Sequence, residues 1–466
     1  MIVALDGTVL TIAQPALRRD LHASFAQVQW TSTGYLIAVA SLLVLAGRLG
    51  DRYGHQRMFA LGILGFGAAS AGIGLAPGVG WVIALRIAQG VFGALLQPAT
   101  LGMLRATYPP DQLAMPLALR TSAIGLAAAA GPVLGGALSA HFGWRAVFFL
   151  NVPPALLVGV LALVARMPTP RRPYDATDAG AQPSTPLSTP TSTPPLRSPL
   201  DLPGAALLSL ALLGLVHTLV ALPESGWTVV TVLTAGAGAA ACGAFIRHET
   251  RTASPLIPPT VLTSRAVVAG LSVLLCASAG LFGALFVGSY FLQDVLGLDP
   301  LQSGLRVLPL AVMMVLSAPA SAVLQRRYGP RRTSLTAMIL LAAGIVLLSQ
   351  LTTSAGPLAI GTSFALLGAG FGTVMVTATA VIVRHVPLDH AGVAGGLQQT
   401  AMNIGPTLGV ALATMLTTLT SARGTTLLAL AAVAATGAFA ACGLPLRTVR
   451  NDTKDTKEAT SPTRVS

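Results

Sequence analysis

Residues Gly47 to Arg57 read GRLGDRYGHQR and place three glycines, three arginines and one aspartate between two long apolar runs. The end of this stretch, Arg52 to Arg57, returns as Arg327 to Arg332, 275 positions later. An apolar motif, Gly131 to Leu138, returns as Gly405 to Leu412, 274 positions later. Two motifs repeated in the same order at almost the same distance indicate an internal duplication.

The composition is that of a protein with many membrane-spanning helices. Hydrophobic residues make up 53% of the 466 residues and charged residues 9%, and the mean hydropathy is +0.74, which excludes an ordinary soluble protein. A bilayer core of ~30 Å needs about 20 apolar residues per helix, and the chain divides into fourteen such runs. The short alternating strands of a membrane barrel are missing from the sequence.

We therefore expect an all-α membrane protein of 14 transmembrane helices, arranged as two six-helix pseudo-symmetric bundles with two inserted helices. Eight helices separate the two copies of the repeated hinge, so both copies face the same side, as in transporters whose halves are related by an axis along the membrane normal. The expected parts are an N-terminal bundle (1–166), a Pro/Ser/Thr-rich cytoplasmic linker (167–200), the inserted helices (201–250), a C-terminal bundle (251–446) and a polar cytoplasmic tail (447–466).

The net charge of +13 is explained better by membrane orientation than by nucleic-acid binding, because the arginines lie at the ends of apolar runs without a basic stripe. With the amino terminus inside, 22 of the 28 Lys and Arg residues fall on the cytoplasmic side, the positive-inside pattern. Both termini are then cytoplasmic. The three cysteines lack metal-ligand spacing, and no cofactor motif occurs.

Two charged residues are expected within spans. Asp6 lies in the first span, about Met1 to Leu17, where an unpaired carboxylate costs ~2.5–3.5 kcal/mol. A carboxyl in such a place can take up and release a proton, although a position near the head groups is the alternative. Arg86, in the fourth span, is the matching cation, whose charge would bias a nearby carboxyl; the alternative is a structural arginine bound to backbone carbonyls.

The opening stretch contains the elements of a cytoplasmic latch. Gly47 and Gly54 permit a tight turn and close helix approach. Asp51 could accept bonds from a helix amino terminus and pair with Arg52 or Arg57. Such pairs can hold two bundles together in one conformation and separate in another, whereas the alternative is a solvated loop.

A second motif lies in the fifth span, where Gly131, Pro132, Gly135 and Gly136 allow close helix approach and a kink. We interpret this motif as a conformational element and not as a binding site.

These motifs resemble those of the major facilitator superfamily. GRLGDRYG at 47–54 resembles its loop signature, LRIAQG at 85–90 its span-four motif, and GPVLGG at 131–136 its antiporter motif. The segments 5–9 and 143–153 are similar to the fourteen-span drug:proton antiporter branch. The resemblance implies alternating access, proton coupling at Asp6 and Arg86, and docking of Asp51 near Gly392 in the other half.

The chain departs from the family pattern in three places. His55-Gln56 replaces the usual basic pair, the segment after Val9 lacks an expected asparagine, and the second hinge has Arg326-Arg327 where the first has Asp51-Arg52. The two hinges therefore cannot be equivalent latches.

The sequence predicts a proton-coupled antiporter, not an enzyme, that exports lipophilic drugs or antibiotics across the inner (cytoplasmic) membrane as a monomer. Its expected partners are a small-molecule lipophilic substrate, protons and the lipid bilayer, without nucleic acid, metal or cofactor. The first alternative is a dedicated exporter of one endogenous metabolite, such as a self-made antibiotic. More remote alternatives are a non-transporting membrane sensor and a membrane enzyme.

Overall fold

The computed structural model of the 466-residue chain describes residues 2–109, 112–164, 201–252, 255–298, 300–387, 390–420 and 423–446, and all regular structure in these ranges is helical. The predicted linker (167–200) and the predicted tail (447–466) lie outside the described residues.

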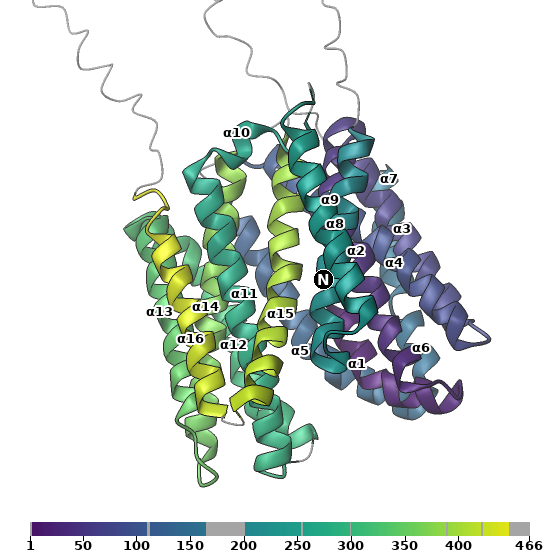
Figure 1. Ribbon diagram of the computed structural model, residues 1–466, viewed down its shortest axis with the longest axis vertical. Helices are drawn as coiled ribbons and strands as arrows, with labels where there is room; N and C mark the ends of the chain where they lie inside the picture. Colours follow the sequence, from purple (N-terminus) through teal and green to yellow (C-terminus); the bar gives the residue numbers. More distant parts are fainter. Residues whose placement is uncertain are drawn as a thin grey trace, which may run out of the picture.

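The helices follow the predicted order (Figure 1). The first group and the inserted pair are α1 (Ile2–Asp20), α2 (Phe25–Tyr53), α3 (His55–Gly74), α4 (Val79–Thr107), α5 (Ala114–Phe142), α6 (Trp144–Phe149), α7 (Val152–Val164), α8 (Leu202–Ser225) and α9 (Val229–Glu249). The remainder are α10 (Pro259–Leu262), α11 (Arg265–Tyr290), the π-helix η2 (Phe291–Val295), α12 (Pro300–Tyr328), α13 (Pro330–Ser349), α14 (Pro357–Arg384), α15 (Ala391–Thr420) and α16 (Arg423–Ala441).

Eleven helical segments in the described part of the chain are long and apolar enough to cross a membrane, with α6 and α7 counted together as Trp144–Val164, so this is a multi-pass membrane protein. The other three predicted spans correspond to α1, α5 and α15, which are helical but do not meet that standard of length and hydropathy within the described residues. A count of fourteen spans therefore stays a prediction.

The repeated hinge forms the same turn in both copies. Gly54 ends α2 with a φ of 98° and its amide donates to the carbonyl of Gly50 at 2.9 Å, and α3 begins at the next residue. Gly329 separates α12 from α13 with a φ of 83°. A side chain at either position would be strained because L-residues rarely adopt positive φ, so the glycine is what lets each helix pair reverse direction.

The predicted sixth span, Trp144 to Ala165, is interrupted in the structure. The regular helix ends at Phe149, the chain makes a turn at Leu150 and Asn151, and α7 begins at Val152, directly before Pro153 and Pro154. Proline has no amide hydrogen and opens the helix hydrogen-bond ladder, so the two prolines were the overlooked sequence signal for the break.

The two helix groups form two bundles that lie side by side (Figure 1). The largest apolar cluster unites α11 to α16, while separate clusters hold α1 to α7 together. The inserted helices α8 and α9 pack against each other, and α8 also lies against α2 of one bundle and α15 of the other. We call the end of the molecule where α7 stops and α8 starts the linker end.

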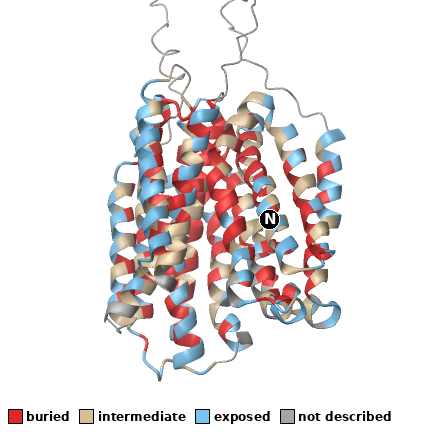
Figure 2. Cartoon of the chain, turned by 45° about the vertical axis from the view of Figure 1, so that its right-hand side comes forward, coloured by how far each residue is buried: buried red, intermediate tan, exposed pale blue. Residues whose placement is uncertain are grey.

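Near the linker end the bundles are joined by direct packing. One apolar cluster combines Leu101, Leu117 and Ala118 from α4 and α5 with Ala318 and Val376 from α12 and α14. Buried residues gather in the interior and exposed ones on the outward faces (Figure 2). Many exposed side chains are large and apolar, such as Leu157, Val229 and Phe439, as suits helices that cross the apolar core of a bilayer.

Candidate functional site

Asp6 is buried inside the N-terminal bundle with 3% of its surface exposed. Its Oδ2 accepts a hydrogen bond at 2.5 Å from Nη1 of Arg86, which is itself 1% exposed. The structure thus brings together the two charged residues that the sequence placed in separate spans, α1 and α4. Removing one partner of such a buried pair typically costs about 3–5 kcal/mol, because the other charge is left uncompensated.

Arg86 is held in place by three further groups. Its Nε donates to the backbone carbonyl of Thr31 at 3.1 Å, and Nη1 also donates to Oε1 of Gln89 at 2.5 Å. The guanidinium carbon lies 4.4 Å from the centre of the Tyr35 ring, which allows a cation–π interaction. The cation is therefore fixed between α2 and α4, and its charge is directed at α1.

Three neutral polar side chains complete the cluster around Asp6. Oδ1 of Asp6 accepts from Nδ2 of Asn151 at 2.8 Å and from Nε2 of Gln89 at 3.3 Å. The hydroxyl oxygen of Ser70 in α3 accepts from Gln89 at 2.6 Å and lies 3.5 Å from Nδ2 of Asn151. Four helices and the α6–α7 break thus converge on one carboxylate, and both of its oxygens have donors.

A second candidate site joins the two bundles at the linker end. Oδ1 of Asp51 accepts from the backbone amide of Gly392 at 2.7 Å, and Oδ2 accepts from that of Val393 at 3.2 Å. These amides belong to the first turn of α15, where backbone N–H groups have no partner inside the helix. A carboxylate there satisfies them and interacts favourably with the helix dipole.

The helices also cross closely at this point. A methyl group on Gly47 would overlap the carbonyl oxygen of Gly392, and a methyl group on Gly392 would overlap that of Gly47. One turn further along α15, a methyl group on Gly396 would lie 2.7 Å from the carbonyl oxygen of Leu43. Close contact of α2 with α15 therefore requires glycine, and it brings Asp51 within reach of the helix start.

The other polar residues of the hinge differ in their contacts and exposure. His55 lies with Nε2 3.3 Å from Oδ1 of Asp51. Arg52 lies with its guanidinium 5.5 Å from the ring of Tyr53, and Arg57 is exposed at the start of α3. Asp51 itself docks on the first turn of α15, and a pairing of Asp51 with Arg52 or Arg57 stays a prediction.

Arg48 makes a contact that the sequence does not predict. Its Nε donates to the carbonyl of Leu256 at 2.7 Å, and Nη2 donates to that of Pro255. These carbonyls precede α10 and the C-terminal bundle, and the amide of Ile257 donates to Glu249 at 2.5 Å. The hinge is thus tied to the segment that leads from the inserted helices into the second bundle.

The glycine-proline motif lies in α5, which is helical from Ala114 to Phe142. A methyl group on Gly135 would lie 2.9 Å from Cγ1 of Val9 in α1, whereas one on Gly136 would meet nothing within 4 Å. Gly131 is buried, and the side chain of Pro132 lies outside the described residues. The motif therefore packs α5 closely against the helix that carries Asp6.

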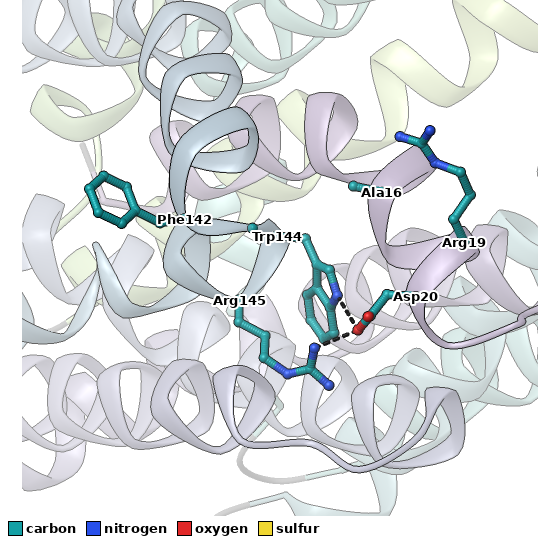
Figure 3. Close-up of a pocket in the computed structure, with 7 residues that line it drawn as sticks. Ala16, Arg19, Asp20, Phe142, Trp144 and Arg145 are labelled. Carbon is teal, nitrogen blue, oxygen red and sulfur yellow. Dashed lines mark hydrogen bonds and ion pairs between the residues drawn. The ribbon is translucent and has the colours of Figure 1, made fainter.

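A surface pocket of about 440 Å³ lies at the end opposite the linker end, where α1 meets the turn between α5 and α6 (Figure 3). Nε1 of Trp144 donates to Oδ2 of Asp20 at 2.9 Å, and Nη1 of Arg145 lies 2.5 Å from the same oxygen. These hydrogen bonds from Trp144 and Arg145 lower the pKa of Asp20 below its ordinary value. The cluster fixes the end of α1 to the start of α6.

Comparison with known proteins agrees with this architecture. The sequence profile of the Major Facilitator Superfamily matches residues 1–410 and, in a second overlapping match, residues 272–465. The human organic anion transporter MFSD10 (TETRAN) has a similar fold, with a TM-score of 0.64 at 15% sequence identity over 94% of this chain and 98% of that one.

Curated relatives are resistance and export proteins. The chain is 42% identical to the tetracenomycin C resistance and export protein of Streptomyces glaucescens, over 88% of this chain and 72% of that protein. It is 34% identical to the puromycin resistance protein of Streptomyces alboniger over 88% and 78% of the two chains, and 29% identical to the multidrug efflux pump LfrA of Mycolicibacterium smegmatis over 88% and 77%. The chain is a transporter that belongs to the major facilitator superfamily.

Proposed function

We propose that this chain is a proton-coupled antiporter that exports lipophilic drugs or antibiotics across the cytoplasmic membrane by alternating access. The observation that carries the proposal is the Asp6 carboxylate, enclosed within a bundle and bonded at 2.5 Å to an arginine. Relatives that are resistance and export proteins support export of a small molecule. The positive-inside distribution supports cytoplasmic termini.

Coupling would run through the charge of Asp6. A proton on this carboxyl removes the negative charge that Arg86 and two amides compensate, so α1 is then held less firmly against α4. Loss of the proton restores the ion pair. Because Arg86 keeps its charge throughout, the proton can be exchanged only at the carboxyl.

The latch would link the protonation of Asp6 to a separation of the two bundles at the linker end. Asp51 on the start of α15, together with the Gly47–Gly392 crossing, holds the linker end closed. We assign this arrangement to the conformation open to the outside. The opposite conformation requires Asp51 to leave α15, after which the two amides of its first turn are free to bond water.

A dedicated exporter of one self-made antibiotic is the second candidate. The names of two relatives favour it, the tetracenomycin C resistance and export protein and the probable actinorhodin transporter of Streptomyces coelicolor, which is 33% identical over 87% of this chain. Both candidates use the same coupling residues and differ only in how many substrates they accept.

The test is transport by the purified full chain in liposomes with an imposed pH gradient, using a panel of lipophilic dyes and antibiotics. Proton-driven movement of several unrelated compounds would identify a multidrug antiporter, and movement of a single antibiotic the dedicated exporter. Asp6→Asn, which removes the titratable group but keeps the shape, should abolish gradient-driven transport while the protein stays in the membrane. Gradient-driven transport at the normal rate by this variant would contradict the coupling assignment.

A further inference from the structure

The α6–α7 break contains Asn151, whose side-chain amide is directed at Asp6 inside the N-terminal bundle. Asn151 is 2% exposed, although it lies between two apolar helical segments. The backbone of the break remains bonded, because the amide of Asn151 donates to the carbonyl of Phe148 and its own carbonyl accepts from Ala155, both at 3.1 Å. The side-chain amide of Asn151 is therefore not needed to bond the backbone of the break, and it donates to Asp6.

The direction of this hydrogen bond determines what Asn151 can do. Nδ2 is a donor only, so its 2.8 Å bond to Oδ1 of Asp6 is made to an acceptor oxygen. A hydrogen bond from such a donor is stronger to a charged carboxylate oxygen than to a neutral one. Arg86 acts in the same sense on Oδ2, at 2.5 Å.

Ser70 fixes the amide that performs this task. Its hydroxyl oxygen lies 2.6 Å from Nε2 of Gln89 and 3.5 Å from Nδ2 of Asn151. Because one acceptor serves both amides, their donor ends are turned toward the same side of the cluster, where Asp6 lies. In the described part of the chain, the titratable groups that face Asp6 are Arg86 from α4 and the Tyr35 phenol from α2.

We propose that Asn151 is a positioning residue of the proton-coupling site, which with Ser70 sets the pH at which Asp6 takes up its proton. The inference rests on the proposed function of Asp6, which it deepens. It gives the interrupted sixth span a purpose: the break carries the donor to the carboxylate. Protonation of Asp6 removes the negative charge that strengthens the Asn151 bond at Oδ1 and the Arg86 bond at Oδ2.

The test measures proton occupancy at Asp6 directly. A hydrophobic carbodiimide reacts with protonated carboxyls, so the fraction of the Asp6 peptide that is modified, measured by mass spectrometry over a range of pH, gives a midpoint for the purified full chain. Asn151→Ala should move this midpoint up by about one pH unit, since it removes a hydrogen bond to a charged group. Asn151→Asp, which keeps the shape but puts a second acid beside Asp6, should move it further.

Controls separate positioning from folding. Asn403 in α15 bonds the backbone of its own helix at 2.8 Å, so Asn403→Ala should leave the midpoint unchanged. Ser70→Ala should move the labelling midpoint upward by less than Asn151→Ala does. If Asn151→Ala does not fold, Ser70→Ala and Asn151→Asp provide the test. Variants that elute as monodisperse protein but keep the normal midpoint would overturn the proposal.

The labelling result is independent of transport. If Asp6→Asn transported normally while Asn151→Ala still shifted the midpoint, the coupling function would fail and the positioning role would stand. If Asp6→Asn lost transport and the midpoint stayed in place, the coupling function would stand and the role of Asn151 would fall.

Discussion

The carboxylate of Asp51 lies 2.7 Å from the backbone amide of Gly392, a residue 341 positions away in the other bundle. A side chain at the end of α2 therefore caps the start of α15. This contact joins the two bundles at the linker end, beside the close Gly47–Gly392 crossing and the apolar packing of α4 and α5 on α12 and α14.

Asp51→Asn should slow transport more than it weakens substrate binding. The variant keeps one acceptor but loses the charge, and a hydrogen bond to a charged group is worth ~1.5–3 kcal/mol. We expect a fall of about tenfold in turnover with little change in the substrate concentration for half-maximal rate, measured in liposomes. Asp294→Asn, at an exposed site in η2, is the matched control. A change confined to substrate affinity would argue against a latch.

Gly47→Ala should destabilise the conformation seen here. The added methyl group meets a backbone carbonyl that cannot turn away, and overpacking of this kind typically costs about 1–3 kcal/mol. A lower melting temperature of the purified protein would show it. Gly243→Ala in α9, where the methyl group meets nothing within 4 Å, should melt normally, and equal melting of both variants would refute the close crossing.

Arg48→Ala should loosen the segment that enters the second bundle. The variant removes the donors to the carbonyls of residues 255 and 256, so the amide of Ile257, bonded to Glu249, should exchange its hydrogen several-fold faster by mass spectrometry. The exposed Arg57→Ala is the control and should exchange normally. Unchanged protection at 257 in Arg48→Ala would show that the contact does not hold the segment.

The hydrogen bonds from Trp144 and Arg145 to Asp20 should persist as the pH falls below the ordinary pKa of an aspartate. Because its hydrogen bonds to Trp144 and Arg145 lower the pKa of Asp20, any stability it contributes is present above the unfolded value, near 3.8, and is lost as the pH falls through the lower folded value. Fluorescence of a variant that keeps only Trp144 should therefore change with a midpoint below 3.8.

Asp20→Asn should abolish that transition. A midpoint above the ordinary aspartate value in the parent variant would contradict the hydrogen bonds to the carboxylate.

The charged residues of the site could be assigned a role from the sequence, whereas their neutral partners could not, although Gln89 and Asn151 lie in the quoted segments 85–90 and 143–153. Asp6 and Arg86 are visible because charge in an apolar run is costly. Ser70 and Asn151 are not, since short polar side chains occur often in membrane helices and bond within their own helix. Only the folded bundle turns these two toward the same carboxylate.

For the fold as well, some features could be predicted from the sequence and others could not. Two repeats and apolar runs were enough to predict the helices and the hinge turns, because glycine, proline and hydrophobicity act locally. The break before Val152 was missed because hydropathy does not change across it. The Arg48 contact depends on carbonyls more than 200 positions away, which no local pattern indicates.

Helix α2 has one further property that follows from its length. Thr31, whose carbonyl holds Arg86, and Asp51, which holds α15, lie on the same unbroken helix, and twenty residues of α-helix are ~30 Å long. A rigid rod of that length tilted by about 10° at one end moves by about 5 Å at the other. A hydrogen bond does not survive a displacement of that size. The helix is therefore long enough to convert a slight tilt beside the buried carboxylate into complete release at the far end.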